Sequence, residues 1–101
     1  MATKISFIID NPADPSAFEP VYKRVIQYAA QLPGLQRIES AKVWPKEDKT
    51  PTPAYRTLDL YFESYESASA AVQVPAAGAL FGELVGSGTS FTPLFSDIEE
   101  H

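Results

Sequence analysis

The chain has 101 residues, 45% of them hydrophobic and 21% charged, and its net charge is −5. This length predicts a single domain, residues 1–101, with one hydrophobic core. The acidic balance argues against a nucleic-acid-binding surface, because phosphate backbones attract clustered lysine and arginine. The lysines between residues 42 and 49 do cluster, but Glu47 and Asp48 lie among them, and we interpret this stretch as a solvated loop.

Cysteine is absent, and the only histidine is His101, the last residue. The absence of cysteine excludes a disulfide, a thiolate metal site and a cysteine nucleophile. We therefore expect neither a metal nor another bound cofactor, and no histidine-based catalytic triad. The apolar run at residues 5–9 is too short for a secretion signal or a membrane span, so we expect a soluble, cytoplasmic protein that does not contact membranes.

The first 34 residues predict a strand and a helix. Residues 3–9 are rich in β-branched side chains, which favours a strand. Asp14 and Pro15 form a good helix start, but Pro20 is disfavoured inside a helix. We therefore predict a short turn over residues 15–18 and a main helix that begins at Glu19 and is ended by the Pro-Gly pair at 33–34.

Two strands are predicted next. In residues 35–44, apolar and polar side chains alternate until the pattern shifts by one residue near Ser40, which indicates either a bulge or a bent edge strand. Residues 56–62 alternate strictly and predict a central strand. One face of that strand carries Leu58, Leu60 and Phe62, and the other carries Thr57, Asp59 and Tyr61.

The last part of the chain predicts two helical pieces and an edge strand. Ser64 is a plausible N-cap for a helix over residues 65–73, and a second piece over residues 76–84 is followed by Gly86. Residues 89–96 form the last predicted strand, at an edge because they contain a proline. The order β-α-β-β-α-β predicts an α+β, ferredoxin-like fold, with a four-stranded antiparallel sheet and helices on one face.

A sheet covered on one face leaves the other face exposed. Here that face would carry Ile8, Thr57, Tyr61 and either Leu94 or Phe95, an apolar patch that calls for a partner. We therefore predict a homodimer with Thr57 and Tyr61 in its interface.

Each candidate site residue has two interpretations. Asp59 could be a general base, although a hydrogen bond or ion pair at the dimer interface is the better interpretation. Tyr22 either packs in the core or lines a pocket as a catalytic phenol. Trp44 either anchors a ligand or partner, or packs under the loop that follows it. Phe62 and Phe81 could line a ligand pocket, but side chains of this type more often lie in the core.

Several segments, spread over most of the chain in the same order, resemble the EthD-like family of the dimeric α+β barrel superfamily. They are Asn-Pro-Ala-Asp-Pro at 11–15, Phe18 with Tyr22, Leu-Pro-Gly-Leu at 32–35, Leu-Tyr-Phe-Glu-Ser at 60–64, and Val-Pro at 74–75 followed by Ala-Leu-Phe-Gly-Glu-Leu at 79–84. The resemblance implies a homodimer whose sheets pack face to face, with a pocket between each sheet and its helices. It also implies a link to the degradation of ethyl tert-butyl ether beside a cytochrome P450 system, with no defined molecular role. Relatives in the superfamily include cofactor-free monooxygenases, isomerases, polyketide cyclases and haem-degrading enzymes.

This chain departs from the EthD pattern at one position. The pattern usually has a histidine one turn after the Phe-x-x-x-Tyr pair, where this chain has Val-Ile-Gln-Tyr at 25–28. Ile26 and Tyr28 are therefore expected to line the ligand pocket in place of that histidine. The expected function is a cofactor-free enzyme or auxiliary factor in the degradation of a small apolar ether or aromatic compound. The alternative is a non-catalytic dimeric module that binds a ligand or has a structural role.

Overall fold

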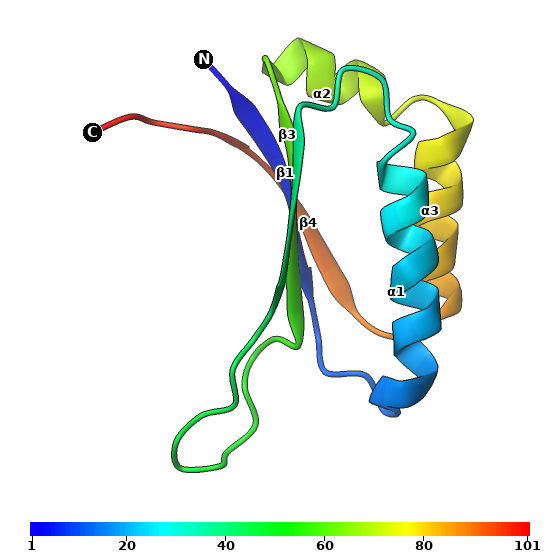
Figure 1. Ribbon diagram of the computed structural model, residues 1–101, viewed down its shortest axis with the longest axis vertical. Helices are drawn as coiled ribbons and strands as arrows, with labels where there is room; N and C mark the ends of the chain where they lie inside the picture. The colour runs from blue at the N-terminus through cyan, green and yellow to red at the C-terminus, as the bar shows by residue number, and fades with distance from the viewer.

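The computed structural model describes residues 1–101, and one antiparallel sheet organises it (Figure 1). The elements are β1 (Thr3–Ile9), α1 (Pro15–Ala29), β2 (Arg37–Lys42), β3 (Arg56–Phe62), α2 (Tyr65–Ala71), α3 (Pro75–Gly86) and β4 (Phe91–Asp97). The strand order is β2-β3-β1-β4, so β1 and β3 are central. The predicted ferredoxin-like fold is confirmed, with the second helical region divided into two helices.

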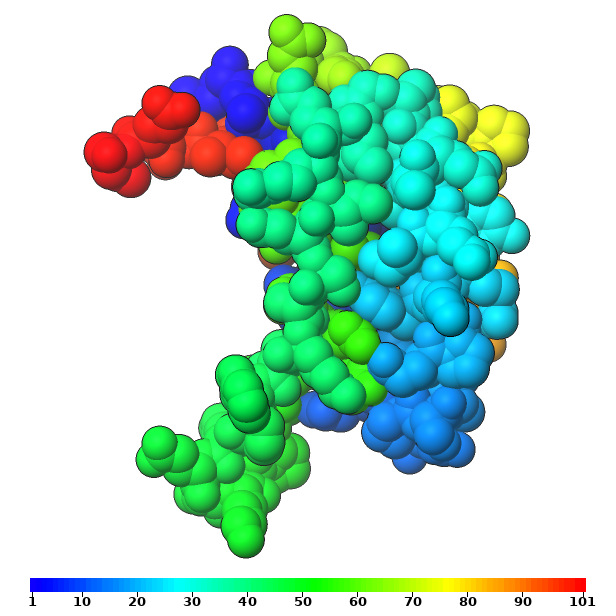
Figure 2. Space-filling view, viewed as in Figure 1, coloured from blue at the N-terminus to red at the C-terminus, as the bar shows by residue number.

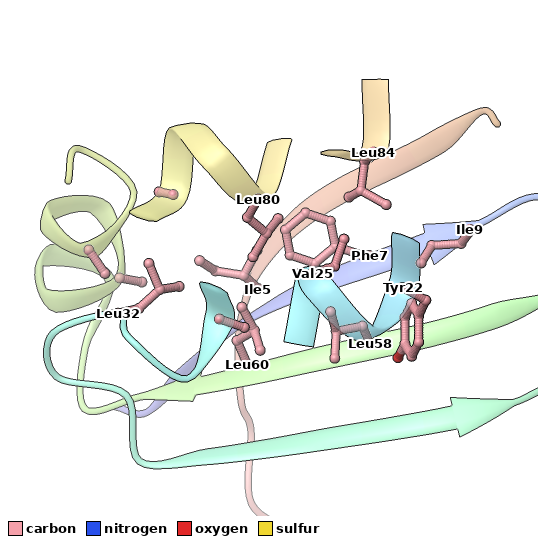
Figure 3. Close-up of a cluster of buried hydrophobic side chains, with 14 of the residues drawn as sticks. Ile5, Phe7, Ile9, Tyr22, Val25, Leu32, Leu58, Leu60, Leu80 and Leu84 are labelled. Atoms are coloured by element: carbon pink, nitrogen blue, oxygen red, sulfur yellow. The ribbon is translucent and has the colours of Figure 1, made fainter. Parts of the chain in front are cut away.

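All three helices lie on one face of the sheet, and the hydrophobic core fills the space between these layers (Figures 1 and 3). The strict alternation of β3 places Leu58, Leu60 and Phe62 in this core, opposite Phe7 and Ile5 of β1. Each fully buried side chain of this size contributes about 1.5–3 kcal/mol of transfer free energy. The alternating apolar residues of the two central strands therefore fix which face the helices cover.

Helix α1 is continuous from Pro15 to Ala29, so the prediction that the main helix begins at Glu19 is wrong. The Asp14 side chain accepts a hydrogen bond from the Ser16 N–H, and Pro15 occupies the first turn, where its missing N–H costs nothing. Pro20 removes one helical hydrogen bond, the one to the Ser16 carbonyl, and its ring is exposed. Burial of the apolar side of α1 offsets that loss.

Strand β2 pairs with β3 in a regular register from Arg37↔Tyr61 to Lys42↔Arg56, without a bulge. The sequence alternation slips because β2 is an edge strand with little of its surface buried, so its apolar residues need not share a face. The other edge is β4, as its proline predicted.

Helix α3 runs to Gly86, but the residue with the left-handed backbone (φ 74°) that follows the helix is Gly88.

The face of the sheet without helices is the open face, and it is less apolar than predicted. Leu94 lies on it, beside Ser6, whereas Phe95 pairs with Ile5 on the helix side and its ring packs on Tyr65. Charged side chains occupy much of the remainder, including the ion pairs Lys4–Asp59 (3.6 Å) and Arg37–Glu39 (2.9 Å). The predicted apolar patch is therefore mixed with a polar network.

No single helix is long and apolar enough to cross a membrane. Helices α2 and α3 reach the required length and composition only when taken together, and they are bent by 74° relative to each other. Their buried residues belong to the core on the sheet.

Candidate functional site

A cluster of polar and aromatic side chains connects α1 to the β2–β3 edge of the sheet. The Tyr22 hydroxyl lies 2.6 Å from the Ser40 Oγ atom, and the Arg56 guanidinium lies 4.2 Å from the centre of the Tyr22 ring. Arg56 also donates two hydrogen bonds to the Glu19 carboxylate, of 2.5 and 3.1 Å. Tyr55 donates a third, of 2.8 Å, to the same carboxylate. Figure 3 shows Tyr22 at the margin of the core.

A groove of 660 Å³ runs along the flank of α1 beside this cluster. Its lining residues recur three and four positions apart, as one face of a helix requires: Ser16, Glu19, Pro20, Tyr22, Lys23 and Ile26. Since Tyr22 reaches Ser40 on β2 and Glu19 reaches Arg56 on β3, this flank borders the β2 edge, as in Figure 2. Pro20 has no N–H, so it leaves the Ser16 carbonyl at this groove without a helical donor.

The environment of the cluster sets its protonation states. Burial of the Tyr22 phenol raises its pKa, against the opposing effects of Ser40 and Arg56. The hydrogen bond from Arg56, reinforced by Tyr55, lowers the pKa of Glu19. At neutral pH, Tyr22 is therefore a neutral phenol that can donate or accept a hydrogen bond, and Glu19 is an anion held by its partners. The cluster can bind and orient a polar group, but Tyr22 is a poor base.

The structure brings two of the predicted site residues together. Tyr22, with 5% of its surface exposed, and Ile26 both line the groove. Tyr28 is half-buried and packs against the core. Asp59 lies on the open face, where it accepts a hydrogen bond from Ser6 and pairs with Lys4. Tyr22 and Asp59 are therefore on opposite sides of the sheet and cannot act on the same atom within one protomer.

The remaining predicted ligand-binding residues lie apart from the groove. Phe62 is a core residue with 0% exposure, and Phe81 is half-buried with its ring packed at a tilt against Phe7 and Phe91. Trp44 is 87% exposed and borders a separate hollow of 290 Å³ at the base of the β2–β3 connection. Trp44 is therefore not packed under the loop, the alternative that the sequence had left open.

The two predicted interface residues lie on the open face, as their alternation with the core residues required. Thr57 pairs with Ile8 and Ala41 of the neighbouring strands. The Tyr61 hydroxyl donates a hydrogen bond of 2.6 Å to Glu39, and the Arg37 guanidinium lies 4.3 Å from the Tyr61 ring centre.

Sequence reasoning did not identify Glu19, Ser40 or Arg56 as site residues. Ser40 marked the slip in the strand pattern, and Arg56 begins the alternating strand, but nothing in the spacing connected them with Tyr22. A helical projection would have placed Glu19 beside Tyr22, since the two are three residues apart. The structure contains no group of three or more histidine, cysteine, aspartate or glutamate side chains that could hold a metal ion.

Comparison with known proteins places this geometry among related folds. No protein-family model matches the chain. An uncharacterized 11.0 kDa protein from the thcB-thcC intergenic region of Rhodococcus erythropolis is 31% identical over 100 residues, covering 95% of this chain and 94% of that protein. An ethyl tert-butyl ether d (EthD) family protein from Bacillus halodurans superposes with a TM-score of 0.87 at 17% identity, over 98% of this chain and 100% of that one.

Two further solved structures share the fold. A dimeric ferredoxin-like protein of unknown function from Jannaschia sp. has a TM-score of 0.74 at 15% identity, covering 97% of this chain and 100% of that one. SnoaB, a cofactor-independent oxygenase from Streptomyces nogalater, has a TM-score of 0.67 at 13% identity, covering 99% of this chain and 94% of that one. The solved structures share the ferredoxin-like fold of this chain. The chain therefore belongs to the family of the 11.0 kDa Rhodococcus protein.

Proposed function

We propose that this protein binds a small, mainly apolar organic molecule in the α1 groove and takes part in its breakdown without a bound cofactor. It would act either as an enzyme or as an auxiliary factor to one. The observation that carries this proposal is the placement of Tyr22, a nearly buried phenol whose ring is held by Arg56 and whose hydroxyl is held by Ser40, in the wall of a 660 Å³ groove. Pro20 and Ile26 supply apolar surface beside it.

The chemistry of the groove favours orientation of the substrate over proton abstraction. Burial raises the pKa of Tyr22, so its hydroxyl keeps its proton at neutral pH and can hold a substrate oxygen by a hydrogen bond. A substrate that is itself reactive would need orientation from the protein and no catalytic base. The likeness to SnoaB, described as a cofactor-independent oxygenase, supports this view, as does the EthD description of the Bacillus protein.

We propose in addition that the protein is a homodimer joined through its open face. Helices cover only the other side of the sheet, and the open face forms a concave bay between the C-terminal segment and the β2–β3 connection (Figure 2). Ile8 and Leu94 give this bay apolar surface that water would otherwise cover. The description of the Jannaschia protein as dimeric supports the same arrangement.

The alternative is a module that binds the same kind of ligand without chemistry, or that has only a structural role. One observation favours it: α1 carries isoleucine and tyrosine, at 26 and 28, in the turn where the EthD pattern has a histidine. A side chain that titrates near neutral pH is therefore missing from the groove.

Titration of the protein with a dialkyl ether and with ethylbenzene, followed by NMR, tests the proposal. We expect shifts for Tyr22 and Ile26, and loss of binding in Ile26→Asp, which places a charge on the apolar wall. Gln27→Asp, an exposed neighbour on α1, is the matched control.

Turnover that falls in Tyr22→Phe while binding is retained would support the enzyme, and binding without Tyr22-dependent turnover would support the module. Shifts confined to residues outside the groove would overturn both.

A further inference from the structure

We propose that the ligand of the α1 groove is an amphiphilic organic anion, an aromatic or branched apolar body that bears a carboxylate or another acidic oxygen. This inference rests on the proposed function and specifies the class of ligand. It follows from an excess of positive charge around the groove in a chain whose net charge is −5. Three of the eight lysine and arginine residues lie at or beside the groove: Lys23, Lys42 and Arg56.

Lys23 lines the groove directly. Lys42 on β2 lines the separate hollow beside Trp44, and its charge acts on Glu19 in the groove wall. The Lys42 side chain is on the helix side of the sheet, because Lys42 pairs with Arg56, whose guanidinium covers the Tyr22 ring. Its Nζ atom lies 5.4 Å from the centre of the Tyr55 ring, and the Tyr55 hydroxyl bonds Glu19 in the groove wall. Lys23 therefore stands in the groove on α1, and Lys42 lies on the sheet near Tyr55, the partner of the groove residue Glu19.

The only carboxylate in the groove is already satisfied. Glu19 accepts two hydrogen bonds from Arg56 and one from Tyr55, and this neutralises the charge of Arg56. Lys23 and Lys42 belong to none of the four ion pairs of the structure. Lys42 acts on Glu19 only through its charge, without an ion pair, and Lys23 has no carboxylate within ion-pair distance. Positive charges therefore outnumber the single carboxylate at this groove, and an anion is the partner that this charge selects.

The hydroxyl groups of Tyr22 and Ser40 add a hydrogen-bond donor for an anion. Tyr22 and Ser40 have two O–H protons and share one hydrogen bond, so one proton is left for another acceptor whichever hydroxyl donates. An anionic oxygen accepts such a proton more strongly than a neutral oxygen does. The ring of Pro20 and the side chain of Ile26 would meanwhile contact the apolar body of the ligand.

Two probes of nearly the same shape test the inference, 4-ethylbenzoate and the neutral 4-ethylbenzamide. Both are titrated at low ionic strength into the unaltered protein, into the double variant Lys23→Gln/Lys42→Gln, and into the control Lys46→Gln/Lys49→Gln. The control removes the same total charge from the β2–β3 connection, away from the groove. NMR shifts of Tyr22 and Ile26 report where each probe binds.

We expect the benzoate to bind about tenfold more tightly than the amide, an effect appropriate to two partly exposed charge contacts. The preference should disappear in the groove variant, persist in the control, and weaken as salt is added. Equal affinity of the two probes at the groove would overturn the anion inference and leave the proposed function standing. An equal loss of preference in both double variants would overturn it as well. Absence of groove shifts with either probe would overturn both proposals.

Discussion

The Tyr22 hydroxyl on α1 and the Ser40 hydroxyl on β2 lie 2.6 Å apart, and theirs is the only side-chain hydrogen bond between these two elements. Ser40 belongs to an edge strand with little buried surface, so few other interactions fix the distance between α1 and the strand. The bond thus ties the groove residue Tyr22 to the edge strand. Its removal should loosen the edge without disturbing the core, because the Tyr22 ring stays buried when the hydroxyl is lost.

This bond can be measured by a double-mutant cycle with Tyr22→Phe and Ser40→Ala. We expect a coupling energy of about 0.5–1.5 kcal/mol in the free energy of unfolding, the usual value for one partly buried neutral hydrogen bond. Urea unfolding of the four proteins gives the value. Strictly additive single-variant effects would show that the two hydroxyls do not interact in solution.

The Glu19–Arg56 pair should make stability depend on pH in the acidic range. The pKa of Glu19 is lowered, chiefly by the hydrogen bond from Arg56, so the unfolded state binds a proton at higher pH than the folded state does. The stabilisation by this pair is therefore complete above the pKa of glutamate in the unfolded state, about 4.3. It is lost as the pH falls through the lower pKa of Glu19 in the folded state.

Glu19→Gln is the matched variant for this effect, since it resembles the protonated side chain. We expect the unaltered protein to be more stable than the variant at pH 7, by at most about 1 kcal/mol, because Glu19 is 38% exposed. Thermal unfolding followed from pH 7 down to the acid limit should show the two curves converge. A difference that is constant over this range would refute the assignment.

Gly34 ends the turn after α1 under two constraints. Its φ angle is +78°, and a Cβ atom added there would lie 2.7 Å from the Ser67 Oγ atom. Gly34→Ala should therefore destabilise the protein by about 1–3 kcal/mol through backbone strain and the clash with α2. Gly82→Ala is the control, because it lies within α3 with open space around it and should be neutral or stabilising by up to about 1 kcal/mol. Denaturant unfolding distinguishes the two, and equal effects would contradict the geometry.

A charged substitution at Thr57 tests the proposed dimer. Thr57 lies on the open face between Ile8 and Ala41, so Thr57→Lys would bury an unpaired charge in a face-to-face interface. We expect the unaltered protein to sediment as a dimer at micromolar concentration and the variant as a monomer. Gln73→Lys, on an exposed position after α2, should remain dimeric. A monomer for the unaltered protein would refute the proposed interface.

The order and type of the elements could be predicted from the sequence because they depend on local periodicity and on turn residues. Leu58, Leu60 and Phe62 alternate with polar partners, and this alone identified a central strand and its buried face. Pro93 placed its strand at an edge, and Ser64 identified the start of α2. The start of α1 was predicted wrongly because the cost of Pro20 is local, whereas the burial that offsets it comes from the sheet and from α3.

The composition of the site was decided only by the tertiary structure. Glu19, Ser40 and Arg56 come from three elements, and no spacing along the chain connects them until the register of β2 on β3 places them beside Tyr22. The separation of Tyr22 from Asp59 has the same origin, since the face on which a strand residue lies matters only once helices cover one side. The local alternation of apolar and polar residues therefore determined the sheet and the face that the helices cover. The polar cluster beside the groove was determined only when segments far apart in the sequence came together, because polar side chains bond to whatever lies near them in space.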